Sequence, residues 1–491
     1  MTASHYDVCI IGCGPGGFAA AMRALDLGKR VVIVEKAQIG GAGVMWGALA
    51  SKTMWELSRD YSVAARTDRG YRADALDVDF EAVRRTVLTA IREKQNQMRR
   101  QLRFFSPDRW PGPGSITLKR GRGAFLSSHR LAIISGRRKH EEISADYFLI
   151  AAGSKPRCLP ELAVDQKQVF DSDGVLRLRD FPRRLMIVGA GVVGCEYATV
   201  FAGFGRTKVL LLDHQDRILP FEDADISRFV ATHLKQNNVI IRHGARLCRA
   251  VPGEGGLTVD IREADGGVHT LGVDALLLSV GRVPDLSDLG LDKAGIQIDA
   301  SGRLLTDKNG RVRDHIYAAG DVTAHPSLVN LAEAEGRYVV KHMYGVNRWP
   351  LRYDNMSTVM FFSPPVAAVG LNEKECREKG VAYRAAYYAN ALVNRAIAMR
   401  SVDGFVKIIV TDDAEQKIIG MRAAGPQASS IIVAVAMLMD QGKGIRDVLK
   451  TVYPHPTMSE GIQECLRLLC GKSIYKPQAF PGQIRVHDWR P

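Results

Sequence analysis

A chain of 491 residues is too long for one hydrophobic core, and we expect about three domains. It is 46% hydrophobic and 24% charged, and no apolar run approaches the ~20 residues of a membrane helix, which excludes a transmembrane protein. Residues 1–11 lack the features of a signal peptide, so the sequence indicates a cytoplasmic protein. The net charge of +14 comes from interleaved basic residues with no aromatic-rich basic motif, which predicts a solvated surface and no nucleic-acid partner.

The chain begins with a nucleotide-binding pattern. Residues 6–12 form an apolar run typical of a buried parallel strand, and residues 30–35 predict a second strand that ends at Glu35. Between them lies a G-x-G-x-x-G turn, whose glycines are Gly12, Gly14 and Gly17. Such a turn brings backbone and a helix N-terminus to a pyrophosphate, and the acid accepts from a ribose hydroxyl.

Residues 40–52 come next and read Gly-Gly-Ala-Gly-Val-Met-Trp-Gly-Ala-Leu-Ala-Ser-Lys. Residues 78–106 then predict a long helix with many basic residues. A basic amphipathic helix lies on a membrane in some proteins, but a solvated helix face is the simpler interpretation.

A second nucleotide-binding pattern occupies residues 184–213. Its turn holds the glycines Gly189, Gly191 and Gly194, and its second strand ends at Asp213. An aspartate at this place accepts from both ribose hydroxyls and repels a 2′-phosphate. No arginine directly follows Asp213, although Arg217 is near, so the sequence favours NAD over NADP.

The C-terminal part changes in composition after residue 350 to a mixed α+β pattern, and residues 471–491 read as a tail. Cys465 and Cys470 are five residues apart, which on one helix separates their side chains by about 140° and opposes a disulfide. We interpret both as small buried residues. The eight cysteines show no metal-ligand spacing, so no metal site is predicted and a reducing compartment is indicated.

Several of these segments resemble the pyridine nucleotide-disulfide oxidoreductases. That family writes residues 40–52 as Gly-Gly-Thr-Cys-x-x-x-x-Cys-x-Pro-Ser-Lys, whereas Gly43 and Ala48 stand at the two cysteine positions here and Ala50 replaces the proline. Residues 149–156 and 280–284 resemble the family's domain crossovers, and residues 316–321 resemble the segment whose aspartate meets the ribityl chain and phosphate end of FAD. The resemblance covers nearly the whole chain.

The resemblance implies an α/β fold with two doubly wound Rossmann-like domains and a C-terminal α+β dimerisation domain. The FAD-binding domain would comprise residues 1–153 and 282–350, and the NAD-binding domain residues 154–281. Residues 351–470 would form the dimerisation domain, so we expect a homodimer.

It also implies roles for single residues. Gly153 and Asp321 would contact FAD, with NAD(H) as cosubstrate and NADP(H) the less favoured one. Lys52 and Glu196 would pair beside the flavin, where a cation stabilises negative charge on the reduced ring. His455 would act as a proton donor or base, oriented by Glu460 and shared across the dimer. A structural histidine at the dimer interface is the alternative.

The family passes electrons from flavin to its cysteine pair, and Gly43 and Ala48 form no thiolate. We therefore predict an NADH:acceptor oxidoreductase that reduces a small non-disulfide acceptor, such as a quinone, a dye or a metal, in a pocket near Gly43, Trp46 and Ala48. Two alternatives remain open: a soluble pyridine nucleotide transhydrogenase, and a flavin-bound regulatory or partner protein without turnover.

Overall fold

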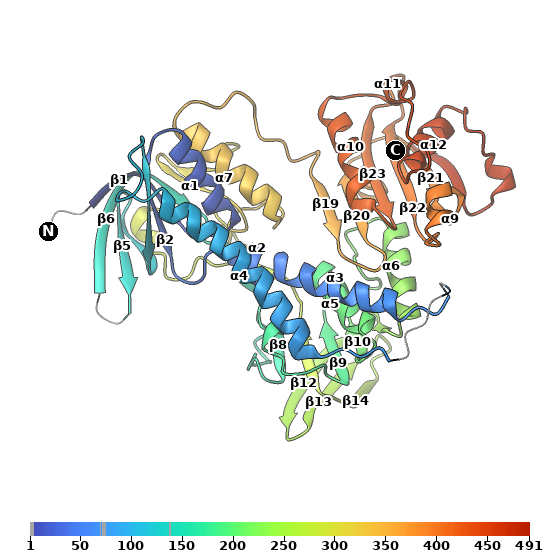
Figure 1. Cartoon of the computed structure of the whole chain (residues 1–491), viewed down its shortest axis with the longest axis horizontal. Helices are drawn as coiled ribbons and strands as arrows, with labels where there is room; N and C mark the ends of the chain where they lie inside the picture. The colour runs from blue at the N-terminus through green and yellow to red at the C-terminus, as the bar shows by residue number, and fades with distance from the viewer. Residues whose placement is uncertain (1–3, 69, 71–74, 137–138) are drawn as a thin grey trace. The chain divides into compact units, whose positions relative to one another are not determined.

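The computed structural model describes residues 4–68, 70, 75–136 and 139–491. The chain divides into two compact units (Figure 1). The first comprises Met1–Leu57, Asp77–Asp180 and Leu277–Leu351, and the second comprises Ser58–Leu76, Phe181–Leu276 and Arg352–Pro491. No described helix is long and apolar enough to cross a membrane.

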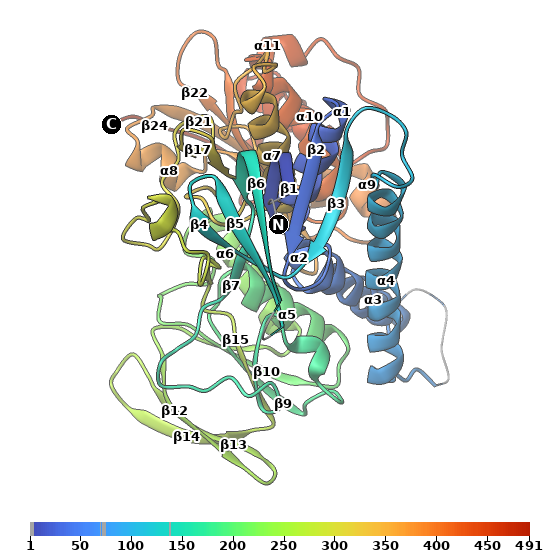
Figure 2. The same ribbon diagram turned by 90° about the vertical axis from the view of Figure 1, so that its left-hand side faces the viewer.

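The first unit is built on a sheet with the order β17-β18-β6-β1-β2-β3. Its elements are β1 (Ser4–Ile11), α1 (Pro15–Asp26), β2 (Arg30–Glu35), α2 (Gly41–Met45), α4 (Phe80–Phe104), β3 (Ser115–Arg120), β4 (Arg122–Ser127), β5 (Arg130–Ser135), β6 (Lys139–Ile150), β7 (Ser154–Pro156), β8 (Val169–Asp171), β16 (Arg282–Pro284), β17 (Arg311–Arg313), β18 (Ile316–Ala318) and α7 (Val329–Met343). Figure 2 shows β6, β1, β2 and β3 side by side.

Strand β1 pairs in parallel with both β2 and β6, as its near-continuous apolar sequence predicts for a buried strand. Helices α1 and α7 pack against one another (Figure 1). Their close approach needs glycine on both sides, because a Cβ at Gly336 would lie 2.2 Å from the carbonyl oxygen of Gly16. This packing fixes the N-terminus of α1 above the ends of the strands.

Helix α3 (Leu49–Ala64) begins in the first unit and ends in the second. The second unit contains β9 (Arg184–Val188), α5 (Val192–Gly203), β10 (Lys208–Leu212), α6 (Ala224–Gln236), β11 (Ile240–Arg242), β12 (Arg246–Gly253), β13 (Gly256–Arg262), β14 (Val268–Val273), β19 (Ser357–Met360), β20 (Val366–Gly370), α8 (Glu373–Glu378), β21 (Tyr383–Ala389), α9 (Asn394–Ala398), β22 (Phe405–Thr411), β23 (Ile418–Ala424), α10 (Ala428–Asp440), α11 (Ile445–Val448), α12 (Glu460–Leu469) and β24 (Ile484–Trp489). Strand β15 (Ala275–Leu278) lies at the unit boundary beside β9.

The C-terminal part of the second unit is a sheet with the order β19-β20-β23-β22-β21-β24. Strand β22 alternates between the two faces of this sheet. Val406, Ile408 and Val410 join one hydrophobic core with residues of α10 and α12. Lys407 therefore points to the opposite face, where it is 1% exposed on its side chain.

The end of the chain differs from the sequence interpretation of residues 471–491 as a tail. Residues 484–489 form β24, which pairs antiparallel with β21 from Ile484 to Trp489. The indole of Trp489 stacks on Tyr383, with ring centroids 6.0 Å apart. Ile484 is buried, and this apolar packing, which a Pro- and Gly-rich composition concealed, holds the strand on the sheet.

Candidate functional site

The first glycine turn connects β1 to α1 and has little free space at two of its glycines. Gly12 has a φ of +106°, and a Cβ there would lie 2.3 Å from the carbonyl oxygen of Ala151. A Cβ at Gly17 would lie 2.0 Å from the carbonyl oxygen of Gly12. Gly14, by contrast, has no atom within 4 Å of its Cβ position and directly precedes α1. The open space therefore lies where a helix N-terminus can receive a phosphate.

Glu35 ends β2 and is 7% exposed. Its carboxylate accepts hydrogen bonds from the backbone N–H of Cys13 (2.7 Å) and of Ala37 (2.6 Å). The acid thus joins the glycine turn to the end of its own strand. Carboxylate oxygens have about four lone-pair positions, so two amide bonds leave capacity for a ribose hydroxyl.

Asp321 is part of a polar relay that sequence reasoning missed. Its Oδ2 accepts from Ser154 Oγ at 2.6 Å, and Ser154 Oγ accepts from Arg282 Nε at 2.9 Å. Arg282 in turn forms an ion pair with Asp173 at 2.6 Å. Burial raises the pKa of Asp173, an effect that Arg282 only partly offsets. The relay fixes the carboxylate of Asp321 relative to both chain crossovers.

Glu335 is a second residue that the sequence did not single out. It is 3% exposed on α7 and accepts a hydrogen bond from the N–H of Gly320 at 2.6 Å. Gly320 precedes Asp321, and its φ of +77° turns the chain there. A buried carboxylate on a helix normally has a partner, and this general rule is the only sequence signal that would have identified it.

The segment from Gly40 to Lys52 forms the short helix α2 and the start of α3. Gly43 is tightly packed, since a Cβ there would lie 2.6 Å from Cγ of Pro15 and 3.3 Å from Cγ2 of Val329. The Pro15 side of Gly43 therefore has no room for a larger side chain unless that ring shifts. The Nε1 of Trp46 is buried and donates to no acceptor among the described residues.

Lys52 and Glu196 lie in different units, so their predicted pairing stays a prediction. Within the first unit, Lys52 Nζ lies 3.3 Å from Ser51 Oγ and 3.4 Å from the carbonyl oxygen of Gly47. Within the second, Glu196 is 7% exposed on α5 and accepts from the N–H of Phe361 at 2.9 Å.

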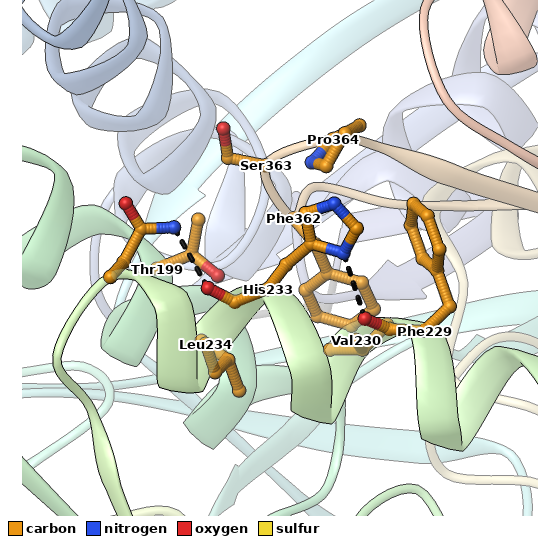
Figure 3. Close-up of a pocket in the computed structure, with 9 residues that line it drawn as sticks. Thr199, Phe229, Val230, His233, Leu234, Phe362, Ser363 and Pro364 are labelled. Carbon is orange, nitrogen blue, oxygen red and sulfur yellow. Dashed lines mark hydrogen bonds between the residues drawn. The ribbon is translucent and has the colours of Figure 1, made fainter. Parts of the chain in front are cut away.

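A small pocket lies one turn along α5 from Glu196 (Figure 3). Thr199, His233 and Phe362 contribute to its lining, and His233 Nδ1 lies 2.9 Å from the carbonyl oxygen of Phe229. The space admits roughly one water molecule. It is too small for an electron acceptor.

The second glycine turn repeats the geometry of the first. Gly189 has a φ of +102°, Gly191 has no atom within 4 Å of its Cβ position, and Gly194 is buried in α5. Asp213 is 8% exposed and accepts from the N–H of Ala190 and, at 2.9 Å, from the N–H of Gln215.

Arg217, the basic residue near Asp213, has partners of its own. It donates to the carbonyl oxygens of Pro220 (2.8 Å) and Glu222 (3.0 Å). Its guanidinium is therefore committed to the loop after β10. His214 Nδ1 lies 3.4 Å from Asp213 Oδ1.

His455 and Glu460 are hydrogen-bonded, with 3.0 Å between Nδ1 and Oε2. Glu460 begins α12 and also accepts from the N–H of Thr457 at 2.7 Å, which orients its carboxylate. The side chain of His455 is 62% exposed and Nε2 has no hydrogen-bond partner among the described residues. The pair presents one ring nitrogen to solvent while the other is held.

The eight cysteines all lie among the described residues, and none forms a disulfide. Cys465 is buried as predicted, whereas Cys470 ends α12 and is partly exposed, which corrects its interpretation as a buried residue. Burial, with a contribution from Glu35, raises the pKa of Cys13 to about 12. Burial likewise raises the pKa of Cys195.

Three carboxylates of the second unit are close enough to suggest a metal site: Asp223, Asp225 and Glu373. The amine of Lys407 lies among them, 2.8 Å, 2.5 Å and 2.6 Å from these residues in turn. A lysine therefore provides the positive charge that a metal ion would otherwise supply.

Comparisons with known proteins agree with this geometry. Residues 6–336 match the model of the pyridine nucleotide-disulphide oxidoreductases. The chain belongs to this family. Residues 356–466 match the family's dimerisation domain, which supports a homodimer. The family assignment and the α/β fold predicted from the sequence are thus confirmed.

The relatives include dihydrolipoyl dehydrogenases and disulfide reductases. Dihydrolipoyl dehydrogenase of Bacillus subtilis (strain 168) is 30% identical, over 96% of this chain and 100% of its own length. LpdA from Mycobacterium tuberculosis has a crystal structure with a TM-score of 0.86 and 26% identity, covering 95% of this chain and 100% of that one. The flavoprotein disulfide reductase RclA from Escherichia coli gives a TM-score of 0.83 and 26% identity, over 96% and 100%.

Members of this family use FAD and a pyridine nucleotide, and the residues present fit both groups. Gly14 and Gly153 leave open space in the first unit, and Gly191 leaves it at the corresponding turn of the second. The buried N–H of Trp46 without an acceptor is the kind of group that a bound ligand satisfies.

Proposed function

We propose that this member of the family is an FAD-dependent NADH:acceptor oxidoreductase that passes electrons to a small non-disulfide acceptor, such as a quinone, a dye or a metal ion. The observation that carries the proposal is the combination of two well-formed glycine turns with Gly43 and Ala48 at the family's cysteine positions. The machinery for accepting a hydride is present, and the dithiol is not.

The buried cysteines supply no substitute thiolate. Only the thiolate is nucleophilic, and a pKa of about 12 keeps Cys13 protonated at neutral pH. Cys195 is fully buried, and so is Cys465, whose Sγ lies 3.3 Å from the carbonyl oxygen of Val406. A disulfide relay through these residues is therefore opposed by their burial.

FAD, when bound, supplies hydride acceptance and electron transfer to the acceptor. We assign the pyrophosphate contacts to the N-terminus of α1 with Gly12, Gly14 and Gly17, and the ribose contact to Glu35. Asp321, held by the Ser154–Arg282 relay, and Gly153 complete the set. We keep the FAD-binding domain at residues 1–153 and 282–350 and the NAD-binding domain at residues 154–281, as the family resemblance implies.

Lys52 would place a positive charge beside the redox centre, and Glu196 would hold that charge in position. The N–H of Phe361 holds the Glu196 carboxylate in position by donating a hydrogen bond to it. NADH would bind at Gly189, Gly191 and Gly194, with its ribose on Asp213. A negative charge at Asp213, with Arg217 engaged elsewhere, supports NADH over NADPH.

His455 would donate the proton that a reduced quinone needs. Glu460 binds Nδ1 and therefore leaves Nε2 to face the acceptor. The exposure of His455 on one chain fits a residue that completes the site of a second subunit. We place the acceptor near Gly43, Trp46 and Ala48, where the Trp46 N–H has no acceptor among the described residues.

The test is anaerobic mixing of the holoenzyme with NADH, followed by a screen of acceptors. NADH should bleach the flavin absorbance, and a quinone, a dye or a metal ion should restore it, whereas lipoamide and glutathione disulfide should not. Cu(II) belongs in the screen because the E. coli RclA structure is a Cu(II) complex. Rapid reoxidation by lipoamide alone would overturn the proposal.

A variant separates the two half-reactions. His455→Gln should lower quinone turnover by ~10²- to 10⁴-fold, the usual effect of losing a general acid, and leave flavin reduction by NADH unchanged. His269→Gln, on an exposed position of β14, is the matched control. Equal loss of both half-reactions would show that His455 does not act specifically in reduction of the acceptor.

The transhydrogenase alternative has less support. Asp173 is engaged by Arg282 in an ion pair and is not free for a second nucleotide. Asp213 opposes NADPH. Reduction of thio-NAD by NADPH at a rate above that of quinone reduction would favour this alternative, and an oxidised flavin that persists with NADH would favour a non-catalytic role.

A further inference from the structure

The end of α4 and the turn after it expose a basic and aromatic surface, which we name the α4 tip (residues 96–110). Arg100, Arg103 and Arg109 are exposed, and Arg99 is partly exposed beside them. Neither Arg100 nor Arg103 forms an ion pair with a described residue. The sequence interpretation that no aromatic-rich basic motif is present is wrong at the α4 tip, because Phe104, Phe105 and Trp110 lie among these arginines.

Three aromatic rings gather among these arginines. Phe104 is 56% exposed, and its ring centroid lies 5.0 Å from that of Phe105 and 5.7 Å from that of Trp110. Phe105 and Trp110 meet edge to face at 5.1 Å. Gly112 packs on the indole, since a Cβ there would lie 2.4 Å from Cζ2 of Trp110. The cluster is a compact apolar knob on an ordered base.

The buried face of α4 explains why this knob is presented outward. The apolar residues of the helix recur at helical spacing and pack into the first unit: Phe80, Val83, Val87, Ile91, Met98 and Leu102. Phe104 falls outside that stripe, and α4 lies beside the edge strand β3 (Figure 2). Phe104 packs on Phe105 and Trp110 yet leaves more than half of its surface exposed, so the cluster offers an apolar surface that a partner can cover.

Two shallow hollows share Phe104 in their linings. One is lined also by Gln97, Arg100, Gln101 and Phe105, and the other by Asn96, Arg99, Arg100, Arg103 and Arg109. Guanidinium groups are suited to phosphate oxygens, which they bind through a planar pair of donors. The surface thus combines hollows lined by arginine and amide side chains with one central apolar group.

We propose that the α4 tip docks the enzyme on an anionic lipid bilayer, with Phe104 entering the interface and the arginines binding headgroup phosphates. Interfacial anchors combine an aromatic group with basic residues in this way. Single-stranded nucleic acid fits less well, because it stacks on open ring faces. Here the rings meet edge to face, and Gly112 covers the indole.

Co-sedimentation of the FAD-loaded enzyme with lipid vesicles tests this surface. The protein should bind phosphatidylcholine vesicles that contain phosphatidylglycerol, release at high salt, and leave pure phosphatidylcholine unbound. Arg100→Gln with Arg103→Gln should weaken partitioning about 25-fold, from roughly fivefold per arginine. Phe104→Ser should weaken it about tenfold.

Matched controls exist on the same chain. Arg246→Gln with Arg249→Gln removes the same charge from exposed positions of β12, and Leu305→Ser alters a side chain that is also 56% exposed. Both should bind as the unaltered enzyme does. Flavin content and far-UV circular dichroism confirm that each variant is folded.

Three outcomes would overturn the proposal: no binding to anionic vesicles, equal binding to neutral ones, or equal losses in the α4-tip and control variants. A fourth would reassign the surface. If a single-stranded oligonucleotide binds and Arg100→Gln with Arg103→Gln abolishes that binding, while vesicles stay unbound, the partner is a nucleic acid.

Discussion

The two nucleotide-binding halves use the same turn and differ in how the chain beyond the acid is held. In the first, Glu35 accepts from the N–H of Cys13, and in the second, Asp213 accepts from the N–H of Ala190. Each donor is the residue between the first two glycines of its turn. In both halves the acid thus ties the strand end to the glycine turn before any nucleotide is bound.

The chain after Asp213 is fixed by buried charges. Glu222 pairs with Arg422 at 2.8 Å, and Asp223 pairs with Lys407 at 2.8 Å. Arg422 and Lys407 both come from the C-terminal sheet. Their buried ion pairs therefore anchor the chain after Asp213 to that sheet. Removing one partner of a buried pair leaves an uncompensated charge.

The chain after Glu35 is fixed by close backbone packing together with exposed or neutral side-chain contacts, among them Lys36 with Asp285 and Arg120 with the carbonyl oxygen of Ala37. Gly40 and Gly41 adopt positive φ values, and a Cβ at Gly41 would lie 3.1 Å from Cα of Gly14. The buried Gln95 donates to the carbonyl oxygen of Ile39 at 3.0 Å. The comparison teaches that the second half holds its loop with specific side chains. The first combines closely packed glycines with side chains that bind the backbone of the loop, and none of these contacts involves positions 43 or 48.

The largest effect is expected from Lys407→Met. This variant leaves Asp223, Asp225 and Glu373 without their buried cation, which should lower the free energy of unfolding of the second unit by about 3–5 kcal/mol. Urea denaturation followed by circular dichroism measures it. Lys417→Met, at an exposed pair with Glu415, should change stability by less than about 1 kcal/mol. Similar values for the two variants would show that the cluster is not an anchor.

The same cluster predicts that stability depends on pH with opposite signs in the unaltered protein and in Lys407→Met. Burial alone would raise the pKa of Asp225 and Glu373, but Lys407 with Arg485 and His487 outweighs burial and lowers both. Lowered carboxyl pKa values stabilise the native protein above about pH 4 and lose that contribution as the pH falls. Without Lys407, burial would raise these pKa values, so acidification toward pH 5 should stabilise Lys407→Met.

The glycine turns separate folding from binding. Gly17→Ala places a methyl group 2.0 Å from a backbone oxygen, so it should cost about 1–3 kcal/mol and lose flavin. Gly14→Ala meets no atom within 4 Å, so it should keep the stability of the apoprotein and weaken only FAD binding. Thermal unfolding of the apoprotein and flavin content per chain distinguish the two. Equal apoprotein stability in both variants would contradict the packing at Gly17.

Local patterns predicted much of the molecule. Each glycine turn and its acid lie within 25 residues of one another in the sequence, and the resemblance to the family implied the contact between His455 and Glu460. The α/β fold followed from these patterns because the turn, strand and helix of each half are specified by adjacent residues.

Longer-range contacts could not be predicted. The relay from Asp321 to Asp173 joins segments more than a hundred residues apart, and Lys407 looked like any residue of a half-buried strand. The knob at Phe104 has a local sequence signal that was missed, but only the fold shows that α4 buries its other apolar residues and leaves this one outside.

Asp213→Asn tests the nucleotide preference of the second half. An amide keeps one acceptor oxygen for the N–H of Ala190 but loses the charge, which should cost NADH about 2 kcal/mol, or roughly 30-fold in KM. The preference for NADH over NADPH should fall by a similar factor. Glu35→Gln, the matching change in the first half, should lower flavin content and leave the NADH to NADPH ratio unchanged. An NADH to NADPH ratio that shifts equally in both variants would contradict the assignment of Asp213 as the residue that selects NADH.

A small change in stability is expected when cysteines are placed at the two positions where the family carries them. In Gly43→Cys with Ala48→Cys, the new Cβ at position 43 would lie 2.6 Å from Cγ of Pro15, and a slight shift of that ring should cost about 1 kcal/mol. The displaced thiol should not act on the flavin, so lipoamide reduction should stay absent and quinone reduction should persist. Adding Pro15→Ala removes the obstructing ring and should be required for any disulfide reductase activity to appear. Lipoamide reduction in the double variant without Pro15→Ala would show that packing at Pro15 does not prevent disulfide chemistry in the first half. The missing cysteines would then be the only feature that separates this half from the reductases.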